Sequence, residues 1–445
     1  MRDLVVAPLF ALCVFLVFKR PYLGIVIWGW SSLMVINKYV YGFSSSIRFT
    51  LFISLITILT SFTSKDKLNF KLDTVGILYI VLLIHGSMSV LFSPSDSSNL
   101  VSEYTKFAKT IVFILFVSFI INDRFKIHVL LIAQCVAMGF HSAREGLKFL
   151  LSAGHHHITG PPQSFIADNN QFALAVLITL PLVAYLYKYS KHKFTRLVLA
   201  GVLFTGILAV LGTFSRGGLL GMMAVGGMFF LRSKKKLLTI AIIVPLAAFS
   251  TTLLSDKWFD RMETLQEADQ DSSFMGRVIA WRVSSLIASE NPIFGGGFHA
   301  VQDYKIWIDI ANSYQSAFDA LGRHPDPHKA HAAHSIYFQV LGDLGYLGLI
   351  LYLVILAFSW FSCTGIIRSS RNIDELKWAG DLAASIQIGL AAFMVSGAAL
   401  SMAYFELAHC LMVLVMVLKR IVNNRLGEIN PLYRRPGSPS ARANA

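Results

Sequence analysis

Long apolar stretches, separated by short polar segments, occupy most of the chain. Because about 20 consecutive apolar residues form a helix that crosses a bilayer, this pattern predicts an all-α polytopic membrane protein with about 12 to 13 transmembrane helices. The predicted spans cover residues 5–18, 22–36, 51–62, 75–92, 110–121, 129–151, 172–187, 197–214, 219–231, 237–254, 336–361, 383–400 and 404–418.

One polar segment interrupts this pattern. Residues 255–333 are predicted to form a large loop outside the bilayer, and helical spacing within the loop predicts short helices. The chain is therefore divided into an N-terminal transmembrane bundle of about ten spans (1–254), this loop, C-terminal transmembrane helices (334–418) and a basic tail (419–445). The composition of the tail predicts disorder.

Composition supports the assignment to membrane proteins and limits the classes of binding partner. Hydrophobic residues make up 55% of the chain, charged residues 14%, and the mean hydropathy is +0.60, which excludes a soluble protein of this length. The net charge of +14 comes from basic residues in every second connection, such as 188–196 and 232–236, and not from one soluble module. We therefore expect contact with membrane lipid and no nucleic-acid partner.

These basic connections also predict the orientation of the chain. By the positive-inside rule they and the tail are cytoplasmic. The turn at Ser215 and the 255–333 loop then face the outside. Thirteen spans with an external N-terminus fit this alternation, and twelve with both ends inside leave one N-terminal segment interfacial; the sequence leaves both open.

Two polar motifs stand at the outer mouths of predicted spans. Ser215-Arg216-Gly217-Gly218 precedes one span, and Ala333-His334-Ser335 precedes another. A charge at the edge of the hydrocarbon is unfavourable unless it is solvated or paired, which makes Arg216 a functional candidate together with Ser215. A guanidinium binds phosphate oxygens through paired hydrogen bonds, and a histidine near its ordinary pKa serves as a general base for a hydroxyl.

The outer loop adds further candidates. A helix is predicted near Gly276–Ile287, with Arg277, Trp281 and Arg282 on one face. A second helix is predicted to begin at Asp326-Pro327 and to carry His328, His331 and His334 at three-residue steps. Between them, Gly295-Gly296-Gly297 form a turn whose bare backbone can approach a substrate, so Gly295 and Gly297 are candidate binding residues.

Several of these groups have alternative interpretations. The histidines at 328, 331 and 334 do not match the i, i+4 spacing of helical zinc sites, and Asp269 and Asp271 lie in a polar run that fits a solvated turn. We therefore predict neither a metal site nor a cofactor. Asn169 and Asn170 either orient sugar hydroxyls or cap a helix, and Lys106 and Lys109 are expected near lipid head groups.

The arginines and the histidine together indicate one reaction. Arg216, Arg277 and His334 are all predicted on the outer side, where they suit a phosphate-linked substrate. The histidine would activate a hydroxyl nucleophile, and the arginines would neutralise the departing phosphate.

At these residues the chain resembles the superfamily of O-antigen ligases and polymerases. The resemblance lies in the ordered motifs Ser215-Arg216-Gly217, Arg277 with Trp281, Gly295-Gly296-Gly297, His334, and Gly342-Asp343-Leu344-Gly345-Tyr346-Leu347-Gly348. Gly160-Pro161-Pro162, the Asp168–Leu174 run and the His334–Gly342 run are similar to the exosortase-associated O-glycosylation ligase branch. Ser335 departs from the asparagine usual in ligases, which leaves the subtype open.

This resemblance implies a metal-independent glycosyltransferase in the bacterial inner membrane, with its active site facing the periplasm. The implied donor is an undecaprenyl-diphosphate-linked glycan, with the diphosphate on Arg216 and Arg277 and the base role on His334. The implied acceptor is a lipid A core sugar, a growing glycan or a protein Ser/Thr hydroxyl. A polymerase of the same superfamily is the first alternative, and a transporter or flippase of lipid-linked sugar is the second.

Overall fold

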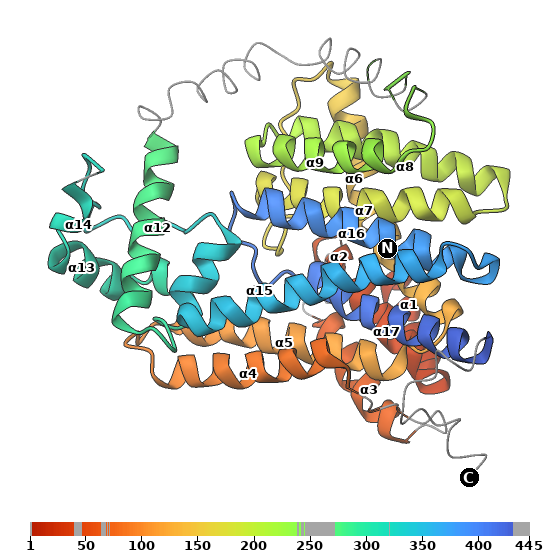
Figure 1. The fold of residues 1–445 in the computed structure, drawn as a ribbon, viewed down its shortest axis with the longest axis horizontal. Helices are drawn as coiled ribbons and strands as arrows, with labels where there is room; N and C mark the ends of the chain where they lie inside the picture. Colours follow the sequence, from red (N-terminus) through yellow and green to blue (C-terminus); the bar gives the residue numbers. More distant parts are fainter. Residues whose placement is uncertain are drawn as a thin grey trace.

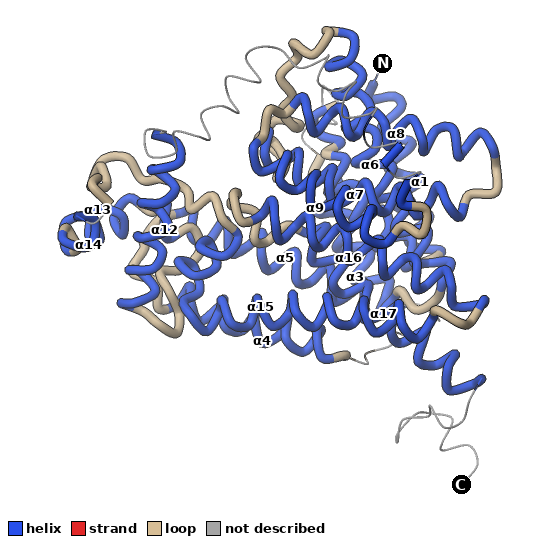
Figure 2. The backbone as a smooth tube through the Cα atoms, turned by 45° about the horizontal axis from the view of Figure 1, so that its top comes forward, coloured by secondary structure: helices blue, strands red, loops and turns tan. Residues whose placement is uncertain are grey.

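The computed structural model describes residues 2–39, 47–63, 72–237, 272–319 and 321–429, with a few single positions between them. These residues fold into helices joined by short connections and include no strand (Figures 1 and 2), which confirms the all-α class. The apolar helices are α1 (Arg2–Lys19), α2 (Pro21–Met34), α3 (Phe49–Thr63), α4 (Thr74–Leu91), α5 (Ser98–Ile120), α6 (Arg124–Leu151), α7 (Asn169–Tyr189), α8 (Lys193–Gly212), α9 (Arg216–Arg232), α15 (Ile336–Ser370), α16 (Lys377–Gly397) and α17 (Glu406–Ile429).

Short polar side chains fix where many of these helices begin. Asp73 accepts a hydrogen bond from the Gly76 amide at the start of α4, and Asp123 accepts one from the Lys126 amide at the start of α6, both at 2.9 Å. Such caps satisfy backbone N–H groups that have no partner within the helix. The local sequence therefore sets where these helices start.

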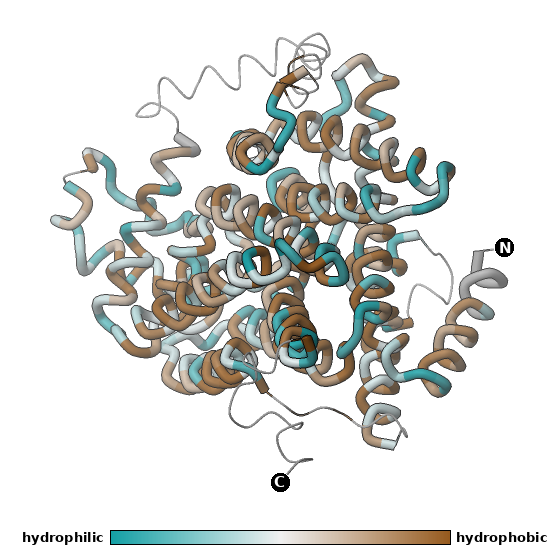
Figure 3. Tube along the Cα trace, turned by 45° about the vertical axis from the view of Figure 1, so that its right-hand side comes forward, coloured by the Kyte–Doolittle hydropathy of each residue, from teal (hydrophilic) through white to brown (hydrophobic). Residues whose placement is uncertain are grey.

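Apolar residues run along the peripheral helices of the bundle as well as along the inner ones (Figure 3). Helices α7 and α16 lie inside it, and α16 packs against α7, α9 and α15. Large apolar side chains such as Leu59 and Leu197 remain 66% and 71% exposed. A helical bundle with apolar side chains both in its interior and on its outer surface is suited to a lipid environment.

Among the described residues, six helices are long and apolar enough to cross a membrane, which supports a multi-pass membrane protein. They span Thr74–Leu91, Arg124–Leu151, Asn169–Tyr189, Lys193–Gly212, Ile336–Ser370 and Asp374–Gly397. The other predicted spans coincide with helices too, except for residues 237–254, most of which lie outside the described residues. The total of 12 to 13 crossings stays a prediction.

The end of α17 differs from the sequence prediction. Helix α17 continues past residue 418 to Ile429, because Val422 and Leu426 still face the bundle and are buried. The predicted disorder of the tail is therefore wrong for residues 419–429, and residues 430–445 lie outside the described residues.

The described part of the large loop is an ordered helical unit. It comprises α12 (Ser272–Glu290), η3 (Ala300–Gln302), α13 (Tyr304–Ser313) and α14 (Ser316–Asp319), beside the start of α15 (Figure 1). This unit has its own small apolar core around Trp307 and Phe318, both fully buried. The prediction of a helix near Gly276–Ile287 is confirmed by α12.

Helix α15 is broken near its start. Gly345 has φ 68° and ψ −171°, which no helical residue adopts. The glycine turn at 295–297 inserts against this break, where the Gly296 amide donates to the Gly342 carbonyl at 2.9 Å and the Gly297 amide donates to the Asp343 carbonyl at 3.0 Å. The Tyr346 amide donates to Pro292 O at 2.9 Å, so the turn satisfies backbone groups near the break.

The contact between these two backbones leads to a stability prediction. A Cβ added at Gly295 would lie 2.5 Å from Gly345 N, and Gly295 has φ +66°. We expect Gly295→Ala to destabilise the protein by about 2 to 4 kcal/mol, from left-handed strain and from overpacking. Thermal unfolding of the detergent-purified protein measures this as a lowered Tm.

Gly322→Ala is the matched control for this substitution. Gly322 also has a positive φ, +64°, but no atom of the described residues lies within 4 Å of the Cβ position. Gly322→Ala therefore measures the destabilisation that left-handed strain alone causes, about 1 kcal/mol. Equal losses for the two variants would contradict a role for the close contact at Gly295.

Candidate functional site

The starts of α9 and α15 both contact the end of α16. Ser396 Oγ, near the end of α16, donates to the Gly217 carbonyl at 2.9 Å. One residue later, a Cβ at Gly397 would lie 2.8 Å from the Ile336 side chain at the start of α15. The motifs at Ser215 and at His334 are therefore at the same end of the bundle, although about 120 residues separate them.

The Ser215-Arg216 turn is tied to the start of α7. Ser215 caps α9 by accepting from the Gly218 amide at 2.9 Å, and its hydroxyl donates to Asn170 Oδ1 at 2.6 Å. Asn170 in turn donates from Nδ2 to Asp168 Oδ1 at 3.0 Å. Arg216 follows this cap as the first residue of α9 and is half-buried.

Asn169 and Asn170 do not cap a helix. Asp168 is the N-cap of α7, and it forms a capping box with Gln171. The buried Asn169 donates from Nδ2 to the Thr213 carbonyl at 2.8 Å, and thus holds the turn before α9 against α7. The capping alternative for the two asparagines is therefore wrong, and their contact with sugar stays a prediction.

His334 lies in a non-helical segment directly before α15. Its φ is +43°, a conformation unfavourable for a side chain with a Cβ, and its ring is half-buried. The preceding Ala333 carbonyl accepts from Trp281 Nε1 at 2.7 Å, and Trp281 stacks on Phe338 with ring centroids 5.2 Å apart. Helix α12 therefore fixes the backbone from which His334 projects.

Three charged or titratable groups act on His334. Burial lowers the pKa of His334 most, and the positive field of Arg277 lowers it further. Asp168 opposes these effects by raising the pKa, and His331 adds a smaller lowering. At neutral pH the imidazole is thus uncharged and able to accept a proton, between an arginine and a carboxylate.

Arg277 approaches this group from the first half of α12. Its neighbour Gly276 has the His331 ring 3.6 Å from its Cβ position, so no side chain keeps this part of α12 away from the histidine segment. Arg277 is half-buried, whereas Arg282 is exposed and has no side-chain hydrogen bond or ion pair among the described residues. The prediction of one shared face thus holds for Arg277 and Trp281, and the structure does not bring Arg282 into the group.

The predicted helix from Asp326 to His334 is wrong. Asp326 Oδ1 accepts from the His328 amide at 2.9 Å and closes a local turn. Trp307 Nε1 donates to the Asp326 carbonyl at 2.8 Å, as Trp281 does to that of Ala333, so indole groups take carbonyls that a helix would use. The histidines therefore share no helix face; the ring of His331 packs on Trp307, with centroids 5.8 Å apart.

The glycine turn is buried against α15. Gly295 and Gly297 have φ of +66° and +88°, and Cβ atoms there would lie within 2.6 Å of Gly345 N and of Ser93 Oγ respectively. The close approach that these glycines permit is thus to the protein itself. Their predicted contact with substrate stays a prediction.

The remaining candidates lie elsewhere or outside the described part. Asp269 and Asp271 fall among the residues that the structure does not describe. Within the described ranges no group of three or more His, Cys, Asp or Glu side chains is arranged to hold a metal ion.

One functional candidate was missed from the sequence. Asp168 was read only as part of a run of similar residues, yet it caps α7, orients Asn170 and acts on His334. The signal was available, because an aspartate three residues before a glutamine marks a helix start. Its nearness to His334 depends on α7 and α15 both packing against α16, and no local signal reports it.

Two parts of the chain match known protein families. Residues 201–353 match the family described as O-Antigen ligase, and residues 1–191 match a Family of unknown function (DUF5935). No curated protein matches the chain. The O-Antigen ligase match includes Ser215, Arg216, Arg277 and His334, and it indicates a membrane glycan ligase or polymerase, a glycosyltransferase-like enzyme.

Proposed function

We propose, from the O-Antigen ligase match over residues 201–353, that this protein transfers a glycan from undecaprenyl diphosphate to an acceptor hydroxyl at the periplasmic face of the inner membrane. The observation that carries the proposal is the grouping of His334 with Arg277 and Asp168 beside the start of α9. A neutral base next to a phosphate-binding arginine suits the transfer of a group away from a phosphate.

His334 would act on the acceptor. Its uncharged imidazole takes the proton of the acceptor hydroxyl while the oxygen forms a new bond to the anomeric carbon of the glycan. The bond between that carbon and the diphosphate oxygen breaks, and its electron pair leaves with the diphosphate. The fixed backbone at Ala333, held by Trp281, keeps the ring in position for this transfer.

Arg216 and Arg277 would hold the departing diphosphate. Guanidinium groups bind two phosphate oxygens at once and stay charged at all working pH values. The first turns of α9 and α15 both lie against the end of α16 and add amide groups and positive dipole ends at this end of the bundle, a smaller contribution. Charge that grows on the diphosphate as the bond breaks is thus met by fixed positive groups.

Reconstitution tests the proposal directly. Purified protein in lipid is supplied with an undecaprenyl-diphosphate-linked glycan and a panel of acceptors, and products are identified by mass spectrometry. A lipid A core glycan, a Ser/Thr peptide and a second donor molecule separate the three acceptor classes. Absence of any transfer product, in a protein that binds donor, would contradict the proposal.

A polymerase is the second candidate, because the O-Antigen ligase match fits a ligase or a polymerase. The two reactions share the donor and differ in the acceptor. Elongation of the donor glycan in the assay, without transfer to peptide or core glycan, favours the polymerase. Flipping of donor across vesicles without acceptor, unaffected by substitution of His334, favours a transporter instead.

The pH dependence of transfer follows from the lowered pKa of His334. The base is active when uncharged, so we expect kcat/KM to be constant near pH 7 and to fall at acidic pH, through a pKa below the ordinary value of histidine. Asp168→Asn removes a charge that raises this pKa, so the acid limb should move to lower pH. Rates between pH 4.5 and 8, a range of about two units around the ordinary pKa, show the shift.

Asparagine is also a good N-cap, so Asp168→Asn leaves α7 capped. Asp123→Asn makes the same change at the N-cap of α6 and is the matched control. An acid limb that moves equally in both variants, or in neither, would contradict the action of Asp168 on His334.

A further inference from the structure

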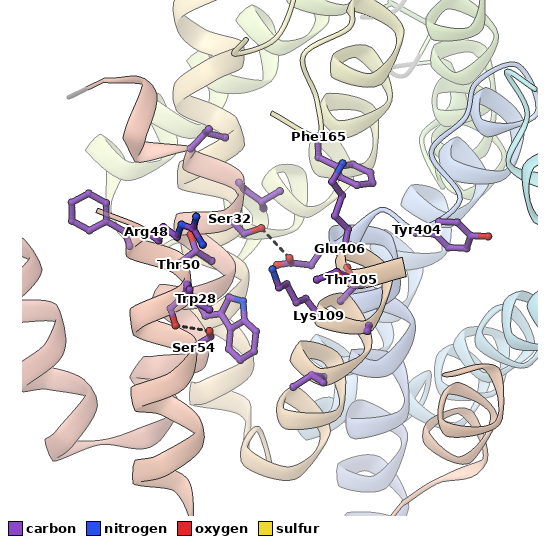
Figure 4. Close-up of a pocket in the computed structure, with 18 of the residues that line it drawn as sticks. Trp28, Ser32, Arg48, Thr50, Ser54, Thr105, Lys109, Phe165, Tyr404 and Glu406 are labelled. Atoms are coloured by element: carbon purple, nitrogen blue, oxygen red, sulfur yellow. Dashed lines mark hydrogen bonds between the residues drawn. The ribbon is translucent and has the colours of Figure 1, made fainter. Parts of the chain in front are cut away.

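A cavity of about 690 Å³ lies between α2, α3, α5 and the start of α17 (Figure 4). Arg216, Arg277 and His334 are not among its lining residues. Its volume is in the range of pockets that bind small molecules or parts of larger ones. The cavity is thus separate from the proposed catalytic group.

Apolar side chains make up most of its wall. Trp28 and Leu33 from α2, Leu51, Leu55 and Ile58 from α3, and Val112 from α5 line it. Leu51 and Leu55 are 37% and 49% exposed, so the α3 side of the cavity is continuous with the apolar exterior of the bundle. A hydrocarbon chain can therefore enter from the surrounding lipid and remain in apolar surroundings.

Cationic side chains line the same cavity. Lys106 pairs with Glu103 at 2.6 Å, which neutralises it. Arg48 and Lys109 also line the cavity and are exposed, and the described residues provide neither of them with an ion pair. Two cations that form no ion pair among the described residues, beside an apolar pocket, match a ligand that joins an anionic group to a hydrocarbon chain.

Groups that bind hydroxyls lie next to these cations. Glu406, at the start of α17, accepts a hydrogen bond from Ser32 Oγ at 2.9 Å, and Figure 4 shows this pair within the pocket. Thr50 and Thr105 also line it. An acid and hydroxyls beside two cations suit a lipid head group that carries hydroxyls next to its phosphate.

The cavity adjoins the segment that leads to Asp168. Phe165 and Ile166 form part of its wall, and Phe165 stacks on Phe405 with centroids 6.1 Å apart and planes at 15°. Two residues after Ile166, Asp168 begins α7 and acts on His334. A ligand in this cavity thus lies against the segment that carries a member of the proposed catalytic group.

We infer that this cavity is a binding site for a phosphate-bearing lipid, with the chain between α3 and α5 and the phosphate on Arg48 and Lys109. The inference does not depend on the transfer reaction, since it rests on other residues. The lipid is either a glycerophospholipid or a polyprenyl phosphate, because both join a phosphate to a hydrocarbon chain.

Native mass spectrometry of the full chain in detergent tests this site with three probes. Dioleoyl phosphatidic acid and a polyprenyl monophosphate should both bind, whereas inorganic phosphate at the same concentration should neither bind nor compete. Loss of one charge-assisted contact should weaken lipid binding about tenfold in Lys109→Met, with Lys109→Arg close to the unchanged protein.

Leu55→Trp fills the apolar part and should weaken both lipids about tenfold, because the chain loses its place. Leu59→Trp is the matched control, one turn further along α3, 66% exposed and outside the cavity wall. Affinity that is unchanged in Leu55→Trp and Lys109→Met overturns the assignment. So does equal binding of inorganic phosphate, or lipid binding that is lost in Arg216→Ala and kept in Lys109→Met.

The two lipid probes also separate the sources of the ligand. Preference for the polyprenyl phosphate assigns a carrier lipid to the cavity, and preference for phosphatidic acid assigns a membrane phospholipid. His334→Asn, expected to lose transfer, should retain lipid binding. The assignment of the lipid site and the proposed transfer reaction can therefore be contradicted independently of each other.

Discussion

Replacement of His334 is expected to remove almost all glycan transfer. Without the imidazole no group of the site takes the acceptor proton, and kcat/KM should fall by about 10² to 10⁴-fold, the usual contribution of general base catalysis. Since His334 has φ +43°, His334→Asn is preferred to His334→Ala, because asparagine tolerates this conformation. Initial rates with the lipid-linked donor, at pH 7 and donor above its KM, measure the loss.

His324→Ala serves as the control for this substitution. His324 lies in the same connection before α15, is exposed, and pairs with Asp319 at 3.2 Å, away from any group that acts on His334. Its variant should keep full activity. If His334→Asn retained activity within about threefold of the unchanged protein, a range below any general-base contribution, the base would have to be another group.

Arg216→Ala and Arg277→Ala should each lower kcat by about 10² to 10³-fold, as loss of one group that stabilises a developing anion does. Lysine at either position should restore part of the rate, because it keeps the charge and loses the paired hydrogen bonds. Arg323→Ala, an exposed arginine in the connection between α14 and α15, is the control and should be unaffected.

The double variant tells whether both arginines act on one diphosphate. Groups that bind the same anion are coupled, so Arg216→Ala with Arg277→Ala should lose less than the product of the single losses. Full additivity would mean that the two act on separate anions. A loss confined to the KM for donor, with kcat retained, would assign the arginines to donor binding alone and contradict their role in the departure of the diphosphate.

Local sequence predicted the helices and their starts well. Runs of apolar residues need lipid or a bundle interior whatever the topology, and caps such as Asp73 and Asp123 act over three residues. The same reasoning failed at residues 326–334, where an aspartate followed by proline resembles a helix start. Trp281 and Trp307, distant in the chain, take the carbonyls there, and no local signal reports them.

The chemistry of the site was readable from residue types, and its assembly was not. A serine and an arginine at one helix mouth and a histidine at another indicated phosphate chemistry on one side of the membrane. Their approach depends on α16, whose Ser396 and Gly397 contact the starts of α9 and α15. That contact depends on side-chain packing between helices remote in sequence, which a hydrophobic pattern leaves undetermined.

The sequence by itself determined that this is an all-helical membrane protein, which residues carry its charge, and where most helices start, because these depend on composition and on neighbours within a few residues. Only the tertiary structure decided that Asp168 lies near His334, that the glycine turn supports a broken α15, and that Arg48 and Lys109 share a cavity. Each of these joins segments far apart in the chain, and the free energy that brings them together comes from packing of whole helices.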